Sequence, residues 1–260
     1  LSKSSLKRSL GYSYPLIPQE IIGLVHRSFD KTMLTNMKSL NVVGHYEIAQ
    51  RLGALSKTFI STIGRAWFPY FMHRAELNTD QARKEIVERY LEVVMIYNYF
   101  CFLLCCFSEE AIKLLTTEAF YPSMYILPLV VFYILFAHTL SAISKPQVVF
   151  SEKLVYTLPP AITALVVNIS LNIYLIPRYG AMGAVLATVA ASIASGTMLF
   201  YFAQKLFPLP IDYGKLVGQL MMFIVFLMFF YFIMLSDVGL ILKLFIKLFL
   251  IGSYFYLTVQ

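Results

Sequence analysis

Apolar residues fill most of the chain in long stretches that short polar segments interrupt. A membrane-spanning helix needs about 20 mostly apolar residues, and eight stretches of suitable length and composition occur. They are residues 11–28, 43–71, 86–107, 122–143, 155–177, 180–203, 216–235 and 238–258. The last four are the clearest, whereas the first two carry polar and charged residues. The pattern predicts an all-α integral membrane protein with no soluble domain.

Composition supports this prediction and argues against nucleic acid as a partner. Hydrophobic residues make up 59% of the chain and charged residues 13%, whereas a soluble domain averages about 25% charged residues. The net charge is +7, but most of the excess falls in the short segments between apolar stretches. Cys101, Cys105 and Cys106 lie inside one apolar stretch, so we interpret them as small buried side chains. We expect neither a metal site nor a cofactor.

The distribution of Lys and Arg predicts a cytoplasmic N-terminus, because cytoplasmic loops are enriched in these residues. Eleven would lie on that side, at positions 3, 7, 8, 74, 83, 84, 89, 145, 153, 205 and 215. Seven would lie on or near the opposite side, at positions 27, 31, 38, 113, 178, 243 and 247. Lys243 and Lys247 stand one turn apart near the start of the last stretch, and we expect both to extend to the interface.

Small residues define the stretch 180–203. They recur at spacings of three and four and therefore share one helix face; the set is Gly180, Gly183, Ala187, Ala190 and Ala194. In lipid, small residues favour helix packing because they let backbones approach closely. We expect an interior helix, with Pro177 ending the helix before it and Gly180 opening this one.

Two amides, Asn168 and Asn172, lie four residues apart on the preceding stretch and so share a face. An amide surrounded by lipid needs a polar partner. Two interpretations remain open: the amides bond to a neighbouring helix, or they contact a substrate or an ion.

The second stretch, 43–71, carries Glu47, Arg51, Lys57 and Arg65 between apolar residues. An Arg or Lys at the bilayer centre costs about 2.5–3.5 kcal/mol on insertion scales, so such residues usually face a polar interior. Arg51 and Arg65 fall near the same helix face, and Lys57 is displaced by roughly a quarter to a third of a turn. The three basic residues are candidates to line a cationic cavity for a phosphate-bearing ligand. Alternatively, Arg51 pairs with Glu47 and Arg65 extends to the cytoplasmic rim.

Two further ionisable residues leave alternatives open. Glu20 lies seven residues before Arg27, near the same helix face, and either lines the cavity or takes part in a buried ion pair. A carboxylate of this kind is what proton or sodium coupling would require. His138, in the fourth stretch, either satisfies a hydrogen bond in the bundle or takes part in proton coupling.

Four segments, in order along residues 11–205, resemble a known family. They are YSYPLIPQEIIGLVHRSFDKTML, VVGHYEIAQRLGALSKTFISTIGRAWFPYFM, EAIKLLTTEAFYPSMYILPLVVF and NISLNIYLIPRYGAMGAVLATVAAS. The set resembles the polysaccharide-export flippases of the Wzx type, in the multidrug/oligosaccharidyl-lipid/polysaccharide exporter superfamily. The resemblance implies a MATE-like helical bundle. Residues 1–205 would form one six-helix transmembrane lobe, and residues 206–260 two additional C-terminal transmembrane helices.

The resemblance also implies a function. The chain would translocate a polyprenyl-pyrophosphate-linked oligosaccharide across the cytoplasmic (inner) membrane for surface polysaccharide, such as the O-antigen of lipopolysaccharide. Alternating access through the cationic cavity would need no covalent chemistry, so we expect no enzyme. The substrate contacts would be Glu20, Glu47, Arg51, Lys57, Arg65, Asn168 and Asn172.

The expected partners are the lipid-linked glycan, membrane lipids and an N-terminal lobe of the same protein. This last expectation follows from the resemblance, which implies a protein of two lobes with this chain as the second; the start at Leu1, not Met, also suggests a piece of a longer protein. Alternatives within the superfamily are a peptidoglycan lipid-precursor flippase and a multidrug/cation antiporter. A membrane-embedded polysaccharide polymerase is a further alternative, but the sequence has no large loop bearing catalytic polar residues.

Overall fold

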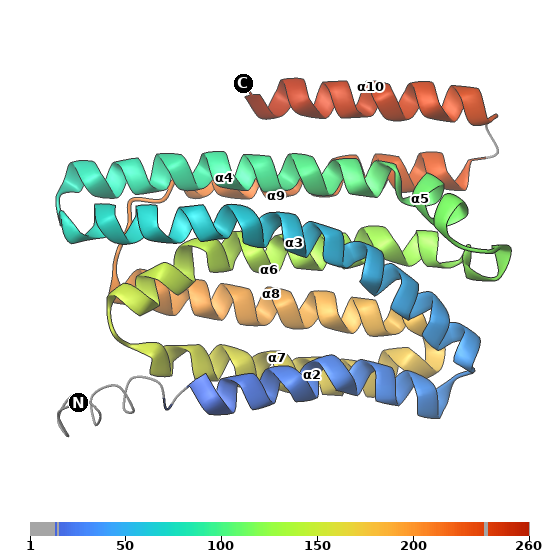
Figure 1. The fold of residues 1–260 in the computed structure, drawn as a ribbon, viewed down its shortest axis with the longest axis horizontal. Coiled ribbons are helices and arrows are strands. Elements are labelled where there is room, and N and C mark those ends of the chain that lie inside the picture. The colour runs from blue at the N-terminus through green and yellow to red at the C-terminus, as the bar shows by residue number, and fades with distance from the viewer. Residues whose placement is uncertain (1–13, 15, 237–238, 260) are drawn as a thin grey trace.

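The fold is helical throughout the described part of the chain. The computed structural model describes residues 14, 16–236 and 239–259 (Figure 1). Its elements are α2 (Leu16–Met37), α3 (Leu40–Glu76), α4 (Asp80–Cys106), α5 (Ser108–Leu115), η1 (Glu118–Phe120), α6 (Ser123–Phe150), η2 (Leu154–Thr157), α7 (Leu158–Tyr179), α8 (Ala181–Leu206), α9 (Tyr213–Leu235) and α10 (Leu240–Val259). Parts of the first and last predicted spans, residues 11–13, 15 and 238, lie outside the described residues, as do Lys3, Lys7 and Arg8.

Each of the eight predicted spans corresponds in position to one long helix. Within the described chain, five segments are long and apolar enough to cross a membrane: Asp80–Cys106, Ser123–Phe150, Leu154–Tyr179, Ala181–Leu206 and Tyr213–Leu235. Helices α9 and α10 present large apolar side chains at their surfaces, including Phe229, Phe232 and Phe249. These features are consistent with a membrane protein, because such surfaces are favourable in lipid.

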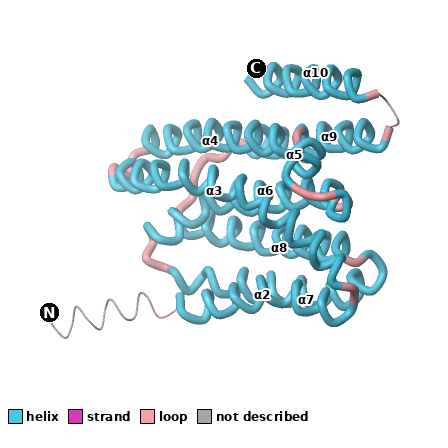
Figure 2. The backbone as a smooth tube through the Cα atoms, turned by 45° about the vertical axis from the view of Figure 1, so that its right-hand side comes forward, coloured by secondary structure: helices cyan, strands magenta, loops and turns pink. Residues whose placement is uncertain are grey.

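The long helices lie roughly along one axis and alternate in direction, so consecutive connections fall at opposite ends of the bundle (Figure 1). Helix α6 packs against α3, α4 and α8. Helices α2 and α7 cover the far side of α8, and α9 and α10 lie on the side of α4, as both views agree (Figure 2). The α2–α3 connection, residues 38–39, and the α3–α4 connection, residues 77–79, lie at opposite ends of α3 and so at opposite ends of the bundle. The predicted topology requires this arrangement.

Local chemistry explains several helix boundaries. The Thr79 hydroxyl accepts a hydrogen bond from the Ala82 amide and caps α4, and Asp212 caps α9 through the Lys215 amide. Such caps satisfy amides that lack intrahelical partners. The prediction that Pro177 ends the helix of the fifth predicted stretch, residues 155–177, is wrong, because α7 continues through it to Tyr179. The break comes at Gly180, whose φ of 56° suits glycine.

Close approach of α7 and α8 depends on Gly183. A Cβ atom at this position would overlap the backbone carbonyl of Leu175. Ala184, Ala187 and Ala191 of the same helix are fully buried. Of the predicted small-residue face, Gly183 and Ala187 are buried, whereas Gly180, Ala190 and Ala194 are partly exposed, so the prediction of an interior face is confirmed only in part.

The linker before α9 is packed against the bundle. Phe207, Leu209 and Ile211 are buried in a cluster with Trp67 and Phe71. The Gln147 side chain donates a hydrogen bond to the Phe207 carbonyl at 2.7 Å. The linker that leads to α9 and α10 is therefore held in place by burial and by this hydrogen bond.

The last helix also carries a buried charge. Lys247 is 1% exposed, and its ammonium lies 2.6 Å from Glu110 and 3.4 Å from Glu109 of α5. Glu109 also pairs with Lys113 at 2.7 Å. The expectation that Lys247 extends to the interface is therefore wrong; it ties α10 to α5 because a buried ammonium needs carboxylate partners. Lys243 donates one hydrogen bond to the Met234 carbonyl, at 3.4 Å.

We predict that Gly183→Ala lowers the free energy of unfolding by about 1–3 kcal/mol, because the added methyl overpacks the α7–α8 contact. Gly218→Ala is the matched control, since its Cβ would meet nothing within 4 Å; this change should be neutral or stabilise by up to about 1 kcal/mol. Thermal unfolding in detergent measures both variants. Equal midpoints for the two would contradict the close packing.

We predict that Lys247→Met destabilises the protein by about 3–5 kcal/mol, because it leaves Glu110 without its ion-pair partner and Glu109 with Lys113 alone. Lys243→Met removes one long hydrogen bond and should cost about 1 kcal/mol or less. The same unfolding measurement distinguishes them, and a Lys247→Met variant as stable as the wild type would refute the charge cluster.

The pH dependence provides a second test of this cluster. Burial acts to raise the pKa of Glu109, but the Lys113 hydrogen bond and the charge of Lys247 outweigh it, so the pKa lies below the ordinary value. A depressed pKa contributes stability above the unfolded value, about 4.3, and this stability is lost as the pH falls through the folded value. The advantage of the wild type over Lys247→Met should therefore shrink below about pH 4.

Candidate functional site

Helix α3 presents two different polar faces. Tyr46, Gln50, Ala54 and Lys57 follow one another at spacings of three and four, so they form one stripe that faces α6 and α8. Arg51 and Arg65 lie on another face and are exposed. A rotation of about 100° per residue separates Lys57 from Arg51 by about a third of a turn. Lys57 is also exposed, but of the three basic residues it is the one that lines a cavity.

A buried carboxylate, Asp30, joins four helices. It is 2% exposed and lies on α2. Its Oδ2 accepts hydrogen bonds from the hydroxyls of Tyr46 on α3 and Thr188 on α8, each at 2.9 Å. Its Oδ1 accepts a bond from Nδ2 of Asn172 on α7 at 2.6 Å. Among the described side chains, every hydrogen-bond partner of Asp30 is neutral and no basic group lies within ion-pair distance.

The two amides complete this network. Asn172 Nδ2 also donates to Asn168 Oδ1 at 3.0 Å, and Asn168 Nδ2 donates to Thr188 Oγ1 at 3.3 Å. Both amides are fully buried. The structure thus has the contacts of the first interpretation, in which the amides bond to neighbouring helices. Asn172 Oδ1 is buried and accepts no hydrogen bond from any described group, so the network retains a free oxygen near Asp30.

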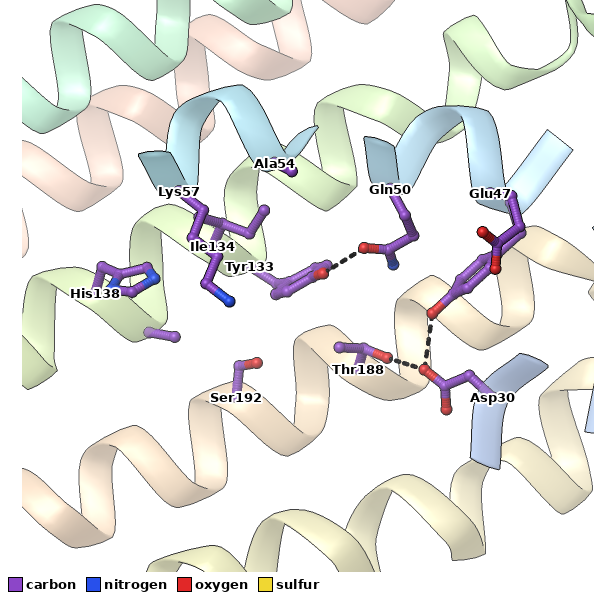
Figure 3. Close-up of a pocket in the computed structure, with 12 residues that line it drawn as sticks. Asp30, Glu47, Gln50, Ala54, Lys57, Tyr133, Ile134, His138, Thr188 and Ser192 are labelled. Atoms are coloured by element: carbon purple, nitrogen blue, oxygen red, sulfur yellow. Dashed lines mark hydrogen bonds between the residues drawn. The ribbon is translucent and has the colours of Figure 1, made fainter. Parts of the chain in front are cut away.

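A cavity of about 400 Å³ opens beside this network (Figure 3). This volume falls in the range of small-molecule sites, about 300–1,000 Å³. Asp30 and Glu47 lie at one end, and Lys57 and His138 lie at the other (Figure 3). Between them the Tyr133 hydroxyl donates to Gln50 Oε1 at 2.7 Å. Polar side chains therefore line the cavity at both ends and between them, alongside apolar ones such as Ile134 and Ala137, and its two ends carry opposite charges.

Two smaller cavities adjoin its basic end. They have volumes of about 210 and 220 Å³, and both are lined by His138, Ser141 and Lys145. The second reaches Gln19 of α2 and Thr157 of η2, which bond to each other at 2.7 Å. His138 thus stands where all three cavities meet.

The other predicted site residues have different positions. Glu47 lines the large cavity but pairs with Lys31 at 3.1 Å, so the alternative in which it pairs with Arg51 is wrong. Glu20 is exposed and interacts electrostatically with Lys145. The side chain of Arg27, its predicted partner, lies outside the described residues. Arg51 and Arg65 line none of the three cavities and make no side-chain hydrogen bond with any described group.

The site also contains residues that were not predicted from the sequence: Asp30, Tyr46, Gln50, Tyr133, Thr188 and Lys145. Asp30 lies beyond the first predicted span, residues 11–28. In the structure α2 continues to Met37. A usable signal was the spacing of polar residues along α3, where Tyr46, Gln50 and Lys57 recur at helical intervals.

The oxygen atoms around Asp30 suit a proton or an alkali-metal cation. Carboxylate, amide and hydroxyl oxygens are hard ligands. Within residues 14, 16–236 and 239–259, no group of three or more His, Cys, Asp and Glu side chains could hold a metal ion. The basic end of the cavity suits an anion instead.

Comparisons with protein-family models, with curated proteins and with solved structures found no match to this chain. The family resemblance of the four segments therefore stays a prediction, and the geometry of the site supplies the argument for function.

We predict that the large cavity is hydrated. Ser192→Cys, in its lining, should react with a small water-soluble methanethiosulfonate, while the native Cys101, Cys105 and Cys106 should not, since each is fully buried. Val225→Cys is the control, because Val225 is 43% exposed on the apolar surface of α9 and detergent or lipid would cover it. Mass spectrometry counts the labels; an unreactive Ser192→Cys would contradict a hydrated cavity.

Proposed function

We propose that the protein is a transporter that flips a polyprenyl-pyrophosphate-linked oligosaccharide across the cytoplasmic membrane, with this chain as one helical lobe. The observation that carries the proposal is the polar cavity in the middle of an otherwise apolar bundle. Charged side chains in such surroundings are costly and generally serve transport or ion pathways. Alternating access would expose the cavity to one side of the membrane at a time.

The basic end of the cavity supports an anionic cargo. An unaided pyrophosphate would lose its hydration in the lipid, and the free-energy cost of this loss is prohibitive for a charged group. Lys57 makes no hydrogen bond or ion pair with a described residue, so its ammonium is free to bind phosphate oxygens. Sugar hydroxyls would find partners in Gln50, Tyr133 and Ser192, and the polyprenyl tail would stay in the bilayer.

The acidic end supports coupling to a cation. A carboxylate buried among neutral partners needs a positive charge for balance, and a proton or a sodium ion would supply it at Asp30. Binding there would change the hydrogen bonds that hold α2 to α7 and α8. This link between an ion and helix packing is what a gradient-driven transporter requires.

A second candidate function is the export of organic cations by the same scaffold. Asp30 and Glu47 favour it, because acidic cavity residues attract cationic compounds. The Lys31–Glu47 pair weakens it, since this pair neutralises one of the two carboxylates.

Transport by the reconstituted full-length protein tests the proposal. Proteoliposomes would receive a fluorescent polyprenyl-pyrophosphate oligosaccharide, and an impermeant reagent would report its appearance in the opposite leaflet. We expect Lys57→Gln to lower the rate at least about tenfold, because one charge-assisted hydrogen bond contributes about 1.5–3 kcal/mol. Lys215→Gln is the matched control, because Lys215 is exposed at the start of α9.

The Asp30→Asn variant separates coupling from cargo binding. It should make transport independent of the proton and sodium gradients. Failure of the wild type to move the lipid-linked sugar, together with Asp30-dependent export of ethidium, would overturn the proposal in favour of the second candidate.

A further inference from the structure

Three basic side chains meet at the junction of the cavities. Lys57 lines the large cavity, Lys145 lines both small ones, and His138 lines all three. They come from α3 and α6, whose positions are fixed by close packing: a Cβ at Gly53 of α3 would overlap Val130 of α6. The junction is therefore a defined location inside the bundle.

Compensation of the two lysine charges is incomplete. The side chains of Lys57, His138 and Lys145 form no hydrogen bond or ion pair of 4 Å or less with any residue that the structure describes. Lys57 and Lys145 both interact electrostatically with His138, and among the described residues Glu20 is the carboxylate that acts on Lys145. The two ammonium groups repel each other and attract an anion.

The neighbouring polar groups suit an oxyanion. Hydroxyls of Ser141 and Ser192 line the cavities that His138 shares, and hydroxyls are donors to phosphate oxygens. Ammonium groups bind phosphate as point charges, so two lysines can hold two phosphoryl groups without the planar geometry that Arg requires.

We propose that Lys57, His138 and Lys145 form a phosphate-oxyanion subsite inside this lobe, at the junction of the three cavities. The inference rests on the proposed function, because it assigns the pyrophosphate of the cargo to a specific place. It differs from the sequence-based expectation in replacing Arg51 and Arg65 by His138 and Lys145. Glu20 competes with the ligand for Lys145.

Calorimetry on the purified full-length protein tests the subsite without requiring transport. Inorganic pyrophosphate and farnesyl pyrophosphate are the two probes. We expect both to bind, and we expect Lys145→Gln and His138→Gln each to weaken binding about tenfold, equivalent to about 1.4 kcal/mol. Lys145→Arg should retain binding, and Lys215→Gln should leave it unchanged. Glu20→Gln should tighten binding, an effect that a purely structural role of Lys145 would not produce.

The outcomes separate the two proposals. Binding of farnesyl pyrophosphate but not of inorganic pyrophosphate supports the subsite if Lys145→Gln and His138→Gln both abolish it. This result would identify the ligand as a lipid headgroup and not as free pyrophosphate. No binding of either probe, or binding that the variants leave unchanged, overturns the subsite even where lipid-linked sugar is still transported. If Lys145→Gln does not fold, the Glu20→Gln and Lys57→Gln titrations decide instead, and unchanged affinity in both refutes the subsite. If the protein does not transport the lipid-linked sugar but still binds pyrophosphate, and the variants weaken that binding, only the proposed function is refuted.

Discussion

A single carboxylate holds the centre of this bundle together. Asp30 accepts hydrogen bonds from Tyr46, Thr188 and Asn172, which belong to three different helices. Buried polar groups are costly without partners, so the burial of Asp30 obliges α2, α3, α7 and α8 to meet there. The close contact at Gly183 brings α8 near enough to α7 for the Asn168 amide to reach Thr188. The small residues and the carboxylate therefore act together. The small residues let α7 and α8 approach closely, and the hydrogen bonds to Asp30 determine which helices meet.

The cavity follows from this arrangement. Polar side chains at helical spacing on α3 face α6 and α8 instead of lipid, and space remains between them. Charges of opposite sign occupy opposite ends of this space, while α9 and α10 present large apolar side chains at their surfaces. A bundle with charged groups in an internal cavity is suited to carrying a polar group past lipid, since the group exchanges water for protein partners.

Sequence reasoning found the helices because hydrophobic stretches of about 20 residues are a strong signal. It also found part of the small-residue face, and the pair Asn168 and Asn172, because both depend only on helical spacing. It failed where tertiary contacts decide. Asp30 lies beyond the end of the first predicted span, Lys247 looked like an interfacial residue, and Arg51 could not be distinguished from Lys57 as a cavity residue. The face that a helix presents to its neighbours depends on tertiary packing, which the residue pattern of a single sequence does not reveal.

The central claim is that Asp30 binds an exchangeable cation. Melting temperatures of the full-length protein and of Asp30→Asn, measured between pH 5 and 9 in sodium, potassium and choline chloride at constant ionic strength, test it most directly. The account predicts that the wild-type midpoint depends on pH or on the identity of the cation, and that Asp30→Asn loses this dependence. A wild type without any such dependence, or a variant that keeps it unchanged, would contradict the account.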